Sequence, residues 1–337
     1  MAVDVRENMA IIVSSGIMYK ARTRRSRIIS FGLLLFTIAC SKTQDTSTSP
    51  NIYIGGFTGQ AGSTAQGVVW KNGVAENKPG TDNITAIAVS GSDVYELSGN
   101  TYWKNGVAVT IPEIHTSSGI AVSGNDIYIS CTTRTSDSGG VGRAGVLYWK
   151  NGVFVNLTQD VPEVNSGSST GIAVSGNDVY VSGSFYTTSH PELSATYWKN
   201  GQLIKLDQAY WTTHCIAASG NDVYVAAQSG ITAGEVLFKN DVPQTLGPHT
   251  KIYNVFTNGP DVYVASFEAT GENDCLYWKN GQSVPLTGGW MTTAIFAYGN
   301  DVYCAGLGTP VTAVYWKNGV LHNLADPGST TCIAVVP

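Results

Sequence analysis

The stretches IAVSGNDVYV at residues 172–181 and YWKNG at residues 197–201 decide the fold, because variants of both recur along the chain. Six segments end in Gly-Asn-Asp-Val-Tyr or a close variant, and an aromatic residue followed by Lys-Asn occurs seven times, at spacings of 33 to 49 residues. Such periods are typical of solenoids and propellers. The aromatic residues of the second motif are Trp70, Trp103, Trp149, Trp198, Phe238, Trp278 and Trp316.

Each repeat predicts four short antiparallel strands. Apolar, β-branched and aromatic residues fill the runs, and Ser-Gly-Asn-Asp or Lys-Asn-Gly separates them as tight-turn sequences. Four strands in about 40 residues form one propeller blade. Residues 51–56 match a second strand and residues 331–336 match a first strand, so the termini are expected to share one blade. We therefore predict an all-β, seven-bladed β-propeller over 51–337, closed by its N- and C-terminal strands rather than an open solenoid.

The repeats resemble the blade plan of WD-type propellers, although they contain no Trp-Asp dipeptide. The Asp-Val-Tyr-Val and Tyr-Trp-Lys-Asn-Gly motifs also resemble those of uncharacterised bacterial lipoproteins, over nearly the whole of 51–337. The resemblance implies a propeller fold and an exported protein. It implies no known activity.

Composition excludes several classes of protein. The chain has 337 residues, of which 43% are hydrophobic and 13% charged, so neither a coiled coil nor a disordered chain is expected. The net charge is −5; residues 1–39 hold six Lys/Arg and two Asp/Glu, so the remainder has 13 basic and 22 acidic residues, or −9. We expect no nucleic-acid partner, because phosphate contacts need an excess of basic residues.

The N-terminus is predicted to be a signal peptide, residues 1–39, with Met18 as an alternative start. A basic run at 18–27 precedes an apolar stretch of 12 residues at 28–39, which is too short to span a bilayer. The sequence FTIAC at 36–40 resembles a lipobox, so Cys40 is the expected lipidation site, and residues 40–50 form a tether. This predicts a protein of the bacterial cell envelope, lipid-anchored to a membrane, either periplasmic or surface-facing. The alternatives are a plain secretory signal with Cys40 as an incidental thiol, or a membrane-spanning anchor.

The two faces of the propeller are expected to differ. The seven lysines of the Lys-Asn motifs and six turn aspartates share one face, where Asp241 completes a seven-to-seven balance, and we interpret them as neutralising one another. The opposite face carries loops of variable length and a surplus of acid. Loops on a rigid scaffold are common binding sites; the alternative is a solvated acidic surface that keeps the protein soluble. The carboxylates of this loop face are Glu113, Asp137, Asp160, Glu163, Glu192, Asp207, Glu268, Glu272, Asp274 and Asp326.

Residues at the start of each first strand should line the central channel. His214 and Tyr253 interrupt a ring of hydroxyls, and Trp211 and Trp290 precede the ring in similar sequence contexts. Aromatic side chains beside hydroxyls and carboxylates suit the stacking of a sugar or peptide. The alternative is that both tryptophans pack their loops against the core. The candidate binding residues are Trp211, His214, Tyr253, Trp290, His249 and Tyr210, with Lys251 nearby. The other ring positions are Thr85, Ser118, Thr170, Thr293 and Thr331.

Two short stretches match enzyme patterns by their letters alone: Gly-x-Ser-x-Gly at residues 167–171 and Gly-x-Gly-x-x-Gly at residues 140–145. Both lie within the predicted strand repeats with no helix expected after them, so neither is interpreted as a nucleophile elbow or a dinucleotide fingerprint, and there is no phosphate loop. No catalytic residue and no cofactor are expected, although Asp137 and Glu272–Asp274 are weak candidates for Ca²⁺. The cysteines beyond Cys40 are expected to be buried thiols, and a Cys275–Cys304 bridge is an open alternative.

The sequence thus favours a binding module for a glycan, peptide or protein partner on the loop face. Two alternatives are a glycan-active hydrolase or lyase on the same face and a structural scaffold of an envelope complex.

Overall fold

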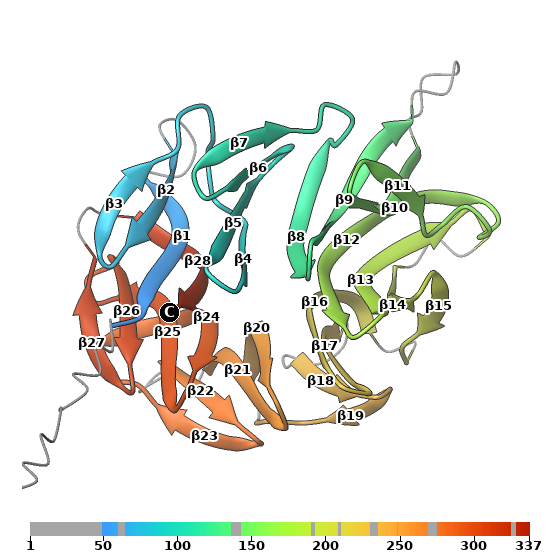
Figure 1. Ribbon diagram of the computed structural model, residues 1–337. Helices are drawn as coiled ribbons and strands as arrows, with labels where there is room; N and C mark the ends of the chain where they lie inside the picture. Colours follow the sequence, from blue (N-terminus) through green and yellow to red (C-terminus); the bar gives the residue numbers. More distant parts are fainter. Residues whose placement is uncertain are drawn as a thin grey trace, which may run out of the picture. The chain divides into compact units, whose positions relative to one another are not determined.

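The computed structural model describes residues 49–59, 65–135, 143–189, 193–207, 210–229, 235–247, 249–268, 275–324 and 328–337. Within these ranges every regular element is a β-strand. The strands form seven four-stranded units arranged around a central axis (Figure 1). The predicted all-β, seven-bladed propeller is confirmed.

The strands of the first three blades along the chain show the shared plan, in which the innermost strand is followed outward by three more. We name each blade after its innermost strand. The β28 blade contains β28 (Gly328–Val336), β1 (Asn51–Thr58), β2 (Gln66–Lys71) and β3 (Val74–Asn77). The β4 blade contains β4 (Ala86–Ser90), β5 (Asp93–Ser98), β6 (Thr101–Lys104) and β7 (Val107–Thr110), and the β8 blade contains β8 (Thr116–Ser123), β9 (Asp126–Thr135), β10 (Arg143–Lys150) and β11 (Val153–Asn156).

The other four blades follow the same order. The β12 blade contains β12 (Val164–Ser175), β13 (Asp178–Thr187), β14 (Ser194–Lys199) and β15 (Gln202–Lys205), and the β16 blade contains β16 (Tyr210–Ser219), β17 (Asp222–Ser229), β18 (Glu235–Lys239) and β19 (Val242–Gln244). The β20 blade contains β20 (Thr250–Asn258), β21 (Asp261–Glu268), β22 (Cys275–Lys279) and β23 (Gln282–Pro285), and the β24 blade contains β24 (Gly289–Tyr298), β25 (Asp301–Gly308), β26 (Ala313–Lys317) and β27 (Val320–Asn323).

The ring is closed by the two ends of the described chain. β28 pairs antiparallel with β1, from Asn51 opposite Val336 to Thr58 opposite Gly328. In Figure 1 the dark red β28 lies directly beside the blue β1. One blade is therefore built from both termini, as predicted, and β1 is paired on both edges, with β28 and with β2.

The Lys-Asn-Gly turns fix the hairpins of the outer strands. The asparagines have φ between 46° and 51°, and the glycines that follow have φ between 79° and 97°. This is the left-handed pair that a two-residue hairpin turn requires. Asp241 replaces the glycine in one turn and still adopts φ 67°.

Each turn asparagine also ties two hairpins together. Asn200 shows the pattern: its Oδ1 accepts a hydrogen bond from the backbone N–H of Val179 at 2.8 Å, and its Nδ2 donates to Asp178 Oδ1 at 2.7 Å. The motif lysine then pairs with the same aspartate in six blades, at 2.8 to 3.1 Å. The charges of this face, the turn face, are thus largely used within the repeat.

Asp241 differs from the other turn aspartates in its partner. It accepts a hydrogen bond from the Tyr197 hydroxyl of the neighbouring blade at 2.8 Å. The lysine without an aspartate is Lys71, because Asn51 occupies that position, and Lys71 lies 5.3 Å from the centre of the Tyr53 ring.

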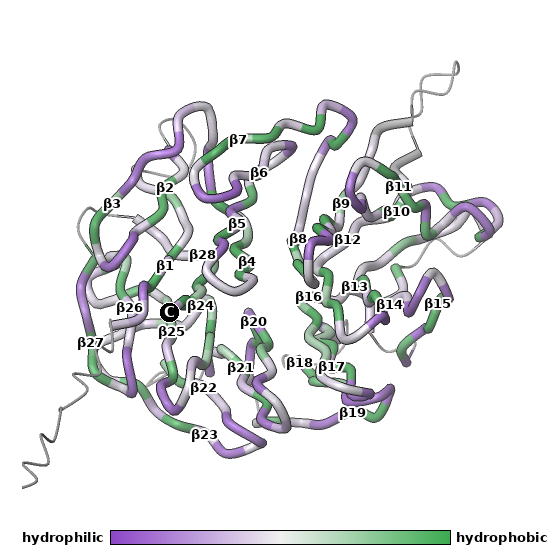
Figure 2. The backbone as a smooth tube through the Cα atoms, viewed as in Figure 1, coloured by the Kyte–Doolittle hydropathy of each residue, from purple (hydrophilic) through white to green (hydrophobic). Residues whose placement is uncertain are grey.

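The core lies between blades rather than at the centre of the ring. Each large cluster joins residues of two adjacent blades; one contains Leu237 of the β16 blade together with Ile252 and Trp278 of the β20 blade. Trp70, Trp198 and Trp316 are fully buried. Figure 2 shows apolar segments on inner strands such as β4 and β16, and hydrophilic segments on outer strands such as β3. Packing between blades holds the inner strands around an open channel.

Candidate functional site

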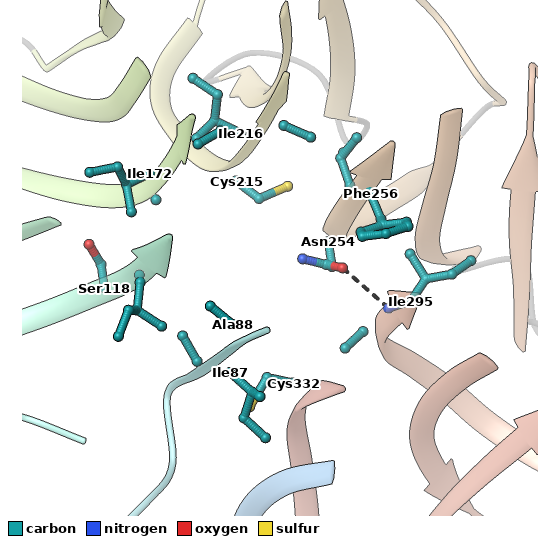
Figure 3. Close-up of a pocket in the computed structure, with 18 of the residues that line it drawn as sticks. Ile87, Ala88, Ser118, Ile172, Cys215, Ile216, Asn254, Phe256, Ile295 and Cys332 are labelled. Atoms are coloured by element: carbon teal, nitrogen blue, oxygen red, sulfur yellow. Dashed lines mark hydrogen bonds between the residues drawn. The ribbon is translucent and has the colours of Figure 1, made fainter. Parts of the chain in front are cut away.

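A cavity of about 570 Å³ occupies the channel. All seven inner strands contribute to its lining, and Figure 3 shows Ile172, Ile216 and Ile295 around it. Asn254 also lies at the cavity, where its Oδ1 accepts a hydrogen bond from the backbone N–H of Ile295 at 3.2 Å (Figure 3). The lining therefore combines apolar side chains with polar ones such as Asn254.

β-Bulges set the predicted ring of residues. In six of the seven inner strands the pairing register skips one residue, and the skipped residue is the ring residue each time. A bulge bends a strand and re-aims the side chain of the extra residue. Of the seven ring residues all but Thr293 line the cavity: Thr85, Ser118, Thr170, His214, Tyr253 and Thr331.

The hydroxyls of this ring bind the blades to one another. Thr170 Oγ1 lies 2.7 Å from Thr213 Oγ1 of the next blade. The same joint recurs between Ser118 and Ser169 at 2.8 Å, and between Thr293 and Thr330 at 2.7 Å. These hydroxyls are engaged structurally, which leaves His214 and Tyr253 as the ring members of a different kind.

His214 lies against a buried carboxylate. Its Nε2 is 3.5 Å from Oε1 of Glu235, whose side chain is 5% exposed. The other oxygen, Oε2, accepts a hydrogen bond from the backbone N–H of Ile252 at 2.6 Å, so Glu235 joins the β16 blade to the β20 blade. Ile252 occupies the position that carries Thr213 or Ser169 in other blades, and the carboxylate replaces the missing hydroxyl.

Glu235 is the site residue that the sequence analysis missed. It lies three residues before the aromatic residue of its Lys-Asn motif, and no other repeat has a carboxylate there. An alignment of the seven repeats would have exposed the difference. The matching residues are Gly67, Asn100, Val146, Ala195, Cys275 and Ala313.

The charge of Glu235 affects residues of its own blade and of the next one. Burial, and after it the nearby Glu235 charge, raises the pKa of Tyr253 above its ordinary value. The same two causes raise the pKa of the Cys215 thiol to about 12. Both groups are therefore neutral at physiological pH, and Tyr253 offers a hydroxyl and an aromatic ring to the cavity.

The predicted aromatic residues divide into two groups. Trp211, Tyr253 and Trp290 are exposed, by 49%, 40% and 47%, in three consecutive blades. Trp211 and Trp290 are also residues skipped in the strand register, at a second bulge that precedes the ring bulge. Neither lines the cavity. Trp290 makes an edge contact with Phe267, with ring centres 6.2 Å apart.

Tyr210, His249 and Lys251 are placed apart from the cavity lining. Tyr210 is half-buried and packs edge-on against Phe238 at 5.0 Å, as part of the core. His249 is exposed in the loop before β20, with φ 61°. Lys251 is half-buried on β20, opposite Phe267.

Metal and cysteine chemistry is limited in the described ranges. They contain no group of three or more His, Cys, Asp or Glu side chains able to hold one ion. The Ca²⁺ candidates Asp137 and Glu272–Asp274 lie outside those ranges, as do Glu192 and Asp326. Cys275 and Cys304 are free thiols, so the bridge considered above is not formed; Cys131, Cys215 and Cys332 are free as well.

The predictions for residues 1–48, including the signal peptide and Cys40, fall outside the described residues. Among the residues that are described, no helix has the length and hydropathy needed to cross a membrane.

Comparisons with known proteins identify the fold alone. No protein-family model matches the chain, and no curated protein matches it. Among solved structures, the acylaminoacyl peptidase of Pyrococcus horikoshii is similar with a TM-score of 0.53 and 12% identity, over 82% of this chain and 50% of the peptidase. An acylaminoacyl peptidase in complex with Z-Gly-Gly-Phe-chloromethyl ketone gives 0.54 and 11%, over 82% and 50%. Apo AztD from Citrobacter koseri gives 0.47 and 12%, over 85% and 98%.

The chain therefore spans about half the length of these peptidases. Together with the strand order, the similarity defines it as a β-propeller.

Proposed function

We propose that this propeller is a binding module that holds a glycan, peptide or protein partner at the channel mouth on its loop face. The observation that carries the proposal is the set of three exposed aromatic residues, Trp211, Tyr253 and Trp290, in consecutive blades. Tryptophan and tyrosine are enriched among residues that dominate binding energy, and exposed ones mark interaction sites.

The contrast between the two faces supports this choice. On the turn face, six lysines are paired with aspartates and all seven motif lysines lie over tyrosine rings. The loop face instead presents aromatic side chains at bulges, where the backbone turns them out of the sheet. A rigid scaffold with exposed aromatic residues loses little entropy on binding.

A capture experiment tests the proposal. The fluorescently labelled full chain is applied to a glycan array and a peptide array, and we expect Trp211→Ala and Trp290→Ala to weaken capture by the retained probes about tenfold or more. Tyr298→Ala is the matched control, because Tyr298 is an exposed aromatic residue at the other end of β24. If no probe is retained, or if both tryptophan variants bind like the wild type, the proposal is wrong.

A glycan-active enzyme is the second candidate, favoured by one observation. His214 beside buried Glu235, with Tyr253 in the same cavity, has the composition of an acid–base site. If the protein turns over array glycans and His214→Ala abolishes this turnover, its function is catalysis and not binding alone. Co-purification of envelope proteins without capture of any probe would instead support a structural scaffold.

We further propose that Cys40 is lipidated and anchors the propeller to a bacterial membrane. Support comes from the basic run, the apolar segment and the lipobox-like FTIAC at 36–40. Mass spectrometry of the mature N-terminus is expected to find diacylglycerol on Cys40, and Cys40→Ser is expected to release the protein from membranes. A mature chain that begins at an unmodified residue other than Cys40 would contradict this.

A further inference from the structure

We infer that the channel mouth at His214, Glu235 and Tyr253 binds the protonated side-chain amine of a lysine-bearing peptide. This inference rests on the proposed binding function and specifies its ligand. It follows from the proton position on His214, the charge of the cavity and the shape of its walls.

The buried carboxylate decides which nitrogen of His214 carries the proton. Nε2 is buried and faces Glu235 Oε1 at 3.5 Å, so a lone pair there would point at a negative charge. With its hydrogen on Nε2, the ring directs that N–H at the carboxylate and presents a lone pair on Nδ1. No described residue donates to Nδ1, and the ring is 35% exposed. His214 thus offers a hydrogen-bond acceptor to a ligand in the cavity.

The charge of the cavity favours a cation as the donor. The carboxylate of Glu235 lies beside the imidazole of His214, and the described lining contains no lysine or arginine. Lys251, on the adjoining strand, is not part of that lining. The ring of Tyr253 adds a π-face, which attracts ammonium groups. An anionic ligand group would be repelled at the same point.

The walls select lysine among amines. Next to His214 and Tyr253, the cavity is lined by Ile216, Val255 and Ile172. A lysine side chain combines a chain of four methylene groups with a terminal ammonium, so it can cover apolar surface while its charged end meets an acceptor.

Glu235 is a positioning residue in this scheme. It orients the proton of His214, and its negative charge attracts the ligand amine without touching it. Its replacement by glutamine keeps an oxygen for the Ile252 N–H but removes the charge. We therefore expect Glu235→Gln to fold, and to lose both the preference for the Nε2–H form of His214 and the affinity for amines.

The test uses two tripeptides that differ by one acetyl group: acetyl-Gly-Lys-Gly-amide and its Nε-acetylated form. Calorimetry on the full chain at about pH 8, where an ordinary histidine is neutral and a lysine is charged, should show binding of the amine peptide about tenfold or more tighter than of the acetylated one. Glu235→Gln and His214→Asn should each lower that affinity about tenfold or more. The control Glu113→Gln, which removes an exposed loop-face charge, should bind as the wild type does.

Nitrogen NMR of histidine-labelled protein supplies a readout without ligand, in which His214 is expected as the Nε2–H form in wild type and as a mixture in Glu235→Gln. Equal affinity for the two peptides, no binding of either, or an unchanged affinity in Glu235→Gln would overturn the inference. If array capture still depends on Trp211 in those cases, the binding function stands and only the amine ligand is wrong. If the tryptophan variants also bind normally, both proposals fail.

Discussion

At the scale of single residues, this propeller depends on side chains that complete the backbone of tight turns. Each motif asparagine accepts a left-handed φ and supplies one acceptor and one donor to the adjacent hairpin. Asparagine is suited to this because its short amide can bond locally in that conformation. The aspartate beside it gains a second role: the hydrogen bond from Lys199 holds the pKa of Asp178 below its ordinary value.

The geometry of this turn predicts that alanine and glycine in place of asparagine lower the stability by different amounts. Asn200→Ala should lower the free energy of unfolding by about 2 kcal/mol, since it loses two hydrogen bonds and places alanine, which lacks the local amide bonds of asparagine, at φ 50°. Asn200→Gly keeps the conformational freedom and should cost less. Urea unfolding followed by tryptophan fluorescence measures both, and an equal loss in the two variants would show that backbone strain contributes nothing.

At the scale of elements, the inner strands are shaped by their bulges. A bulge at the ring position turns one side chain toward the channel, while the residue before it bonds to the ring residue of the preceding blade. Three joints use hydroxyl pairs, whereas the β16–β20 joint uses Glu235. The start of the inner strand therefore joins neighbouring blades where it carries hydroxyl residues. It forms the candidate site where it carries His214 and Tyr253.

A hydroxyl joint should be structural and not functional. Thr170→Val removes the partner of Thr213, which is 1% exposed, and should lower stability by about 1 to 3 kcal/mol because a buried hydroxyl is left unpaired. The double replacement Thr170→Val with Thr213→Val should recover part of the loss, since both partners then become apolar. Thermal unfolding measures stability, and capture on the arrays should stay as in the wild type. Lost capture in a folded Thr170→Val protein would place this joint in the binding site.

At the scale of the whole molecule, stability depends on every joint of a closed ring. The joint between the β28 and β4 blades contains a buried ion pair, with Lys78 Nζ 2.6 Å from Glu96 Oε2. Glu96 stands where other blades have Ile54, Ile129 or Val181. Burial raises the pKa of Glu96 and outweighs the opposing effect of Lys78, so this pair is held at a desolvation cost.

That cost makes the two charges interdependent. Glu96→Gln should destabilise the ring by about 3 kcal/mol or more, because it leaves the buried Lys78 ammonium with only the exposed Glu76 carboxylate, 4.0 Å away, as a counter-charge. The double replacement Lys78→Met with Glu96→Val should be close to neutral or stabilising, since valine occupies this position in other blades. Denaturant titrations of both variants measure the difference. If the double variant is as unstable as Glu96→Gln, the ion pair itself is needed to join the β28 and β4 blades.

Much of the architecture was available in the sequence, because its causes are local. The Lys-Asn-Gly and Gly-Asn-Asp motifs set the turns, the apolar alternation sets the strands, and the half-repeats at residues 51 and 331 set the closure. His214 and Tyr253 were also visible, since they break a pattern that the other blades keep. Their roles as ligand-binding residues remain predictions.

What only the tertiary structure decided is which groups meet across blades. Glu235 lies 21 positions after His214, two strands outward in the same blade, and no local pattern indicates that its carboxylate turns inward to His214 and to the Ile252 N–H. The bulges bring these groups together, and a bulge arises from the fit of neighbouring strands. Repetition along the chain therefore determined the scaffold, whereas the contacts between unequal repeats determined the site.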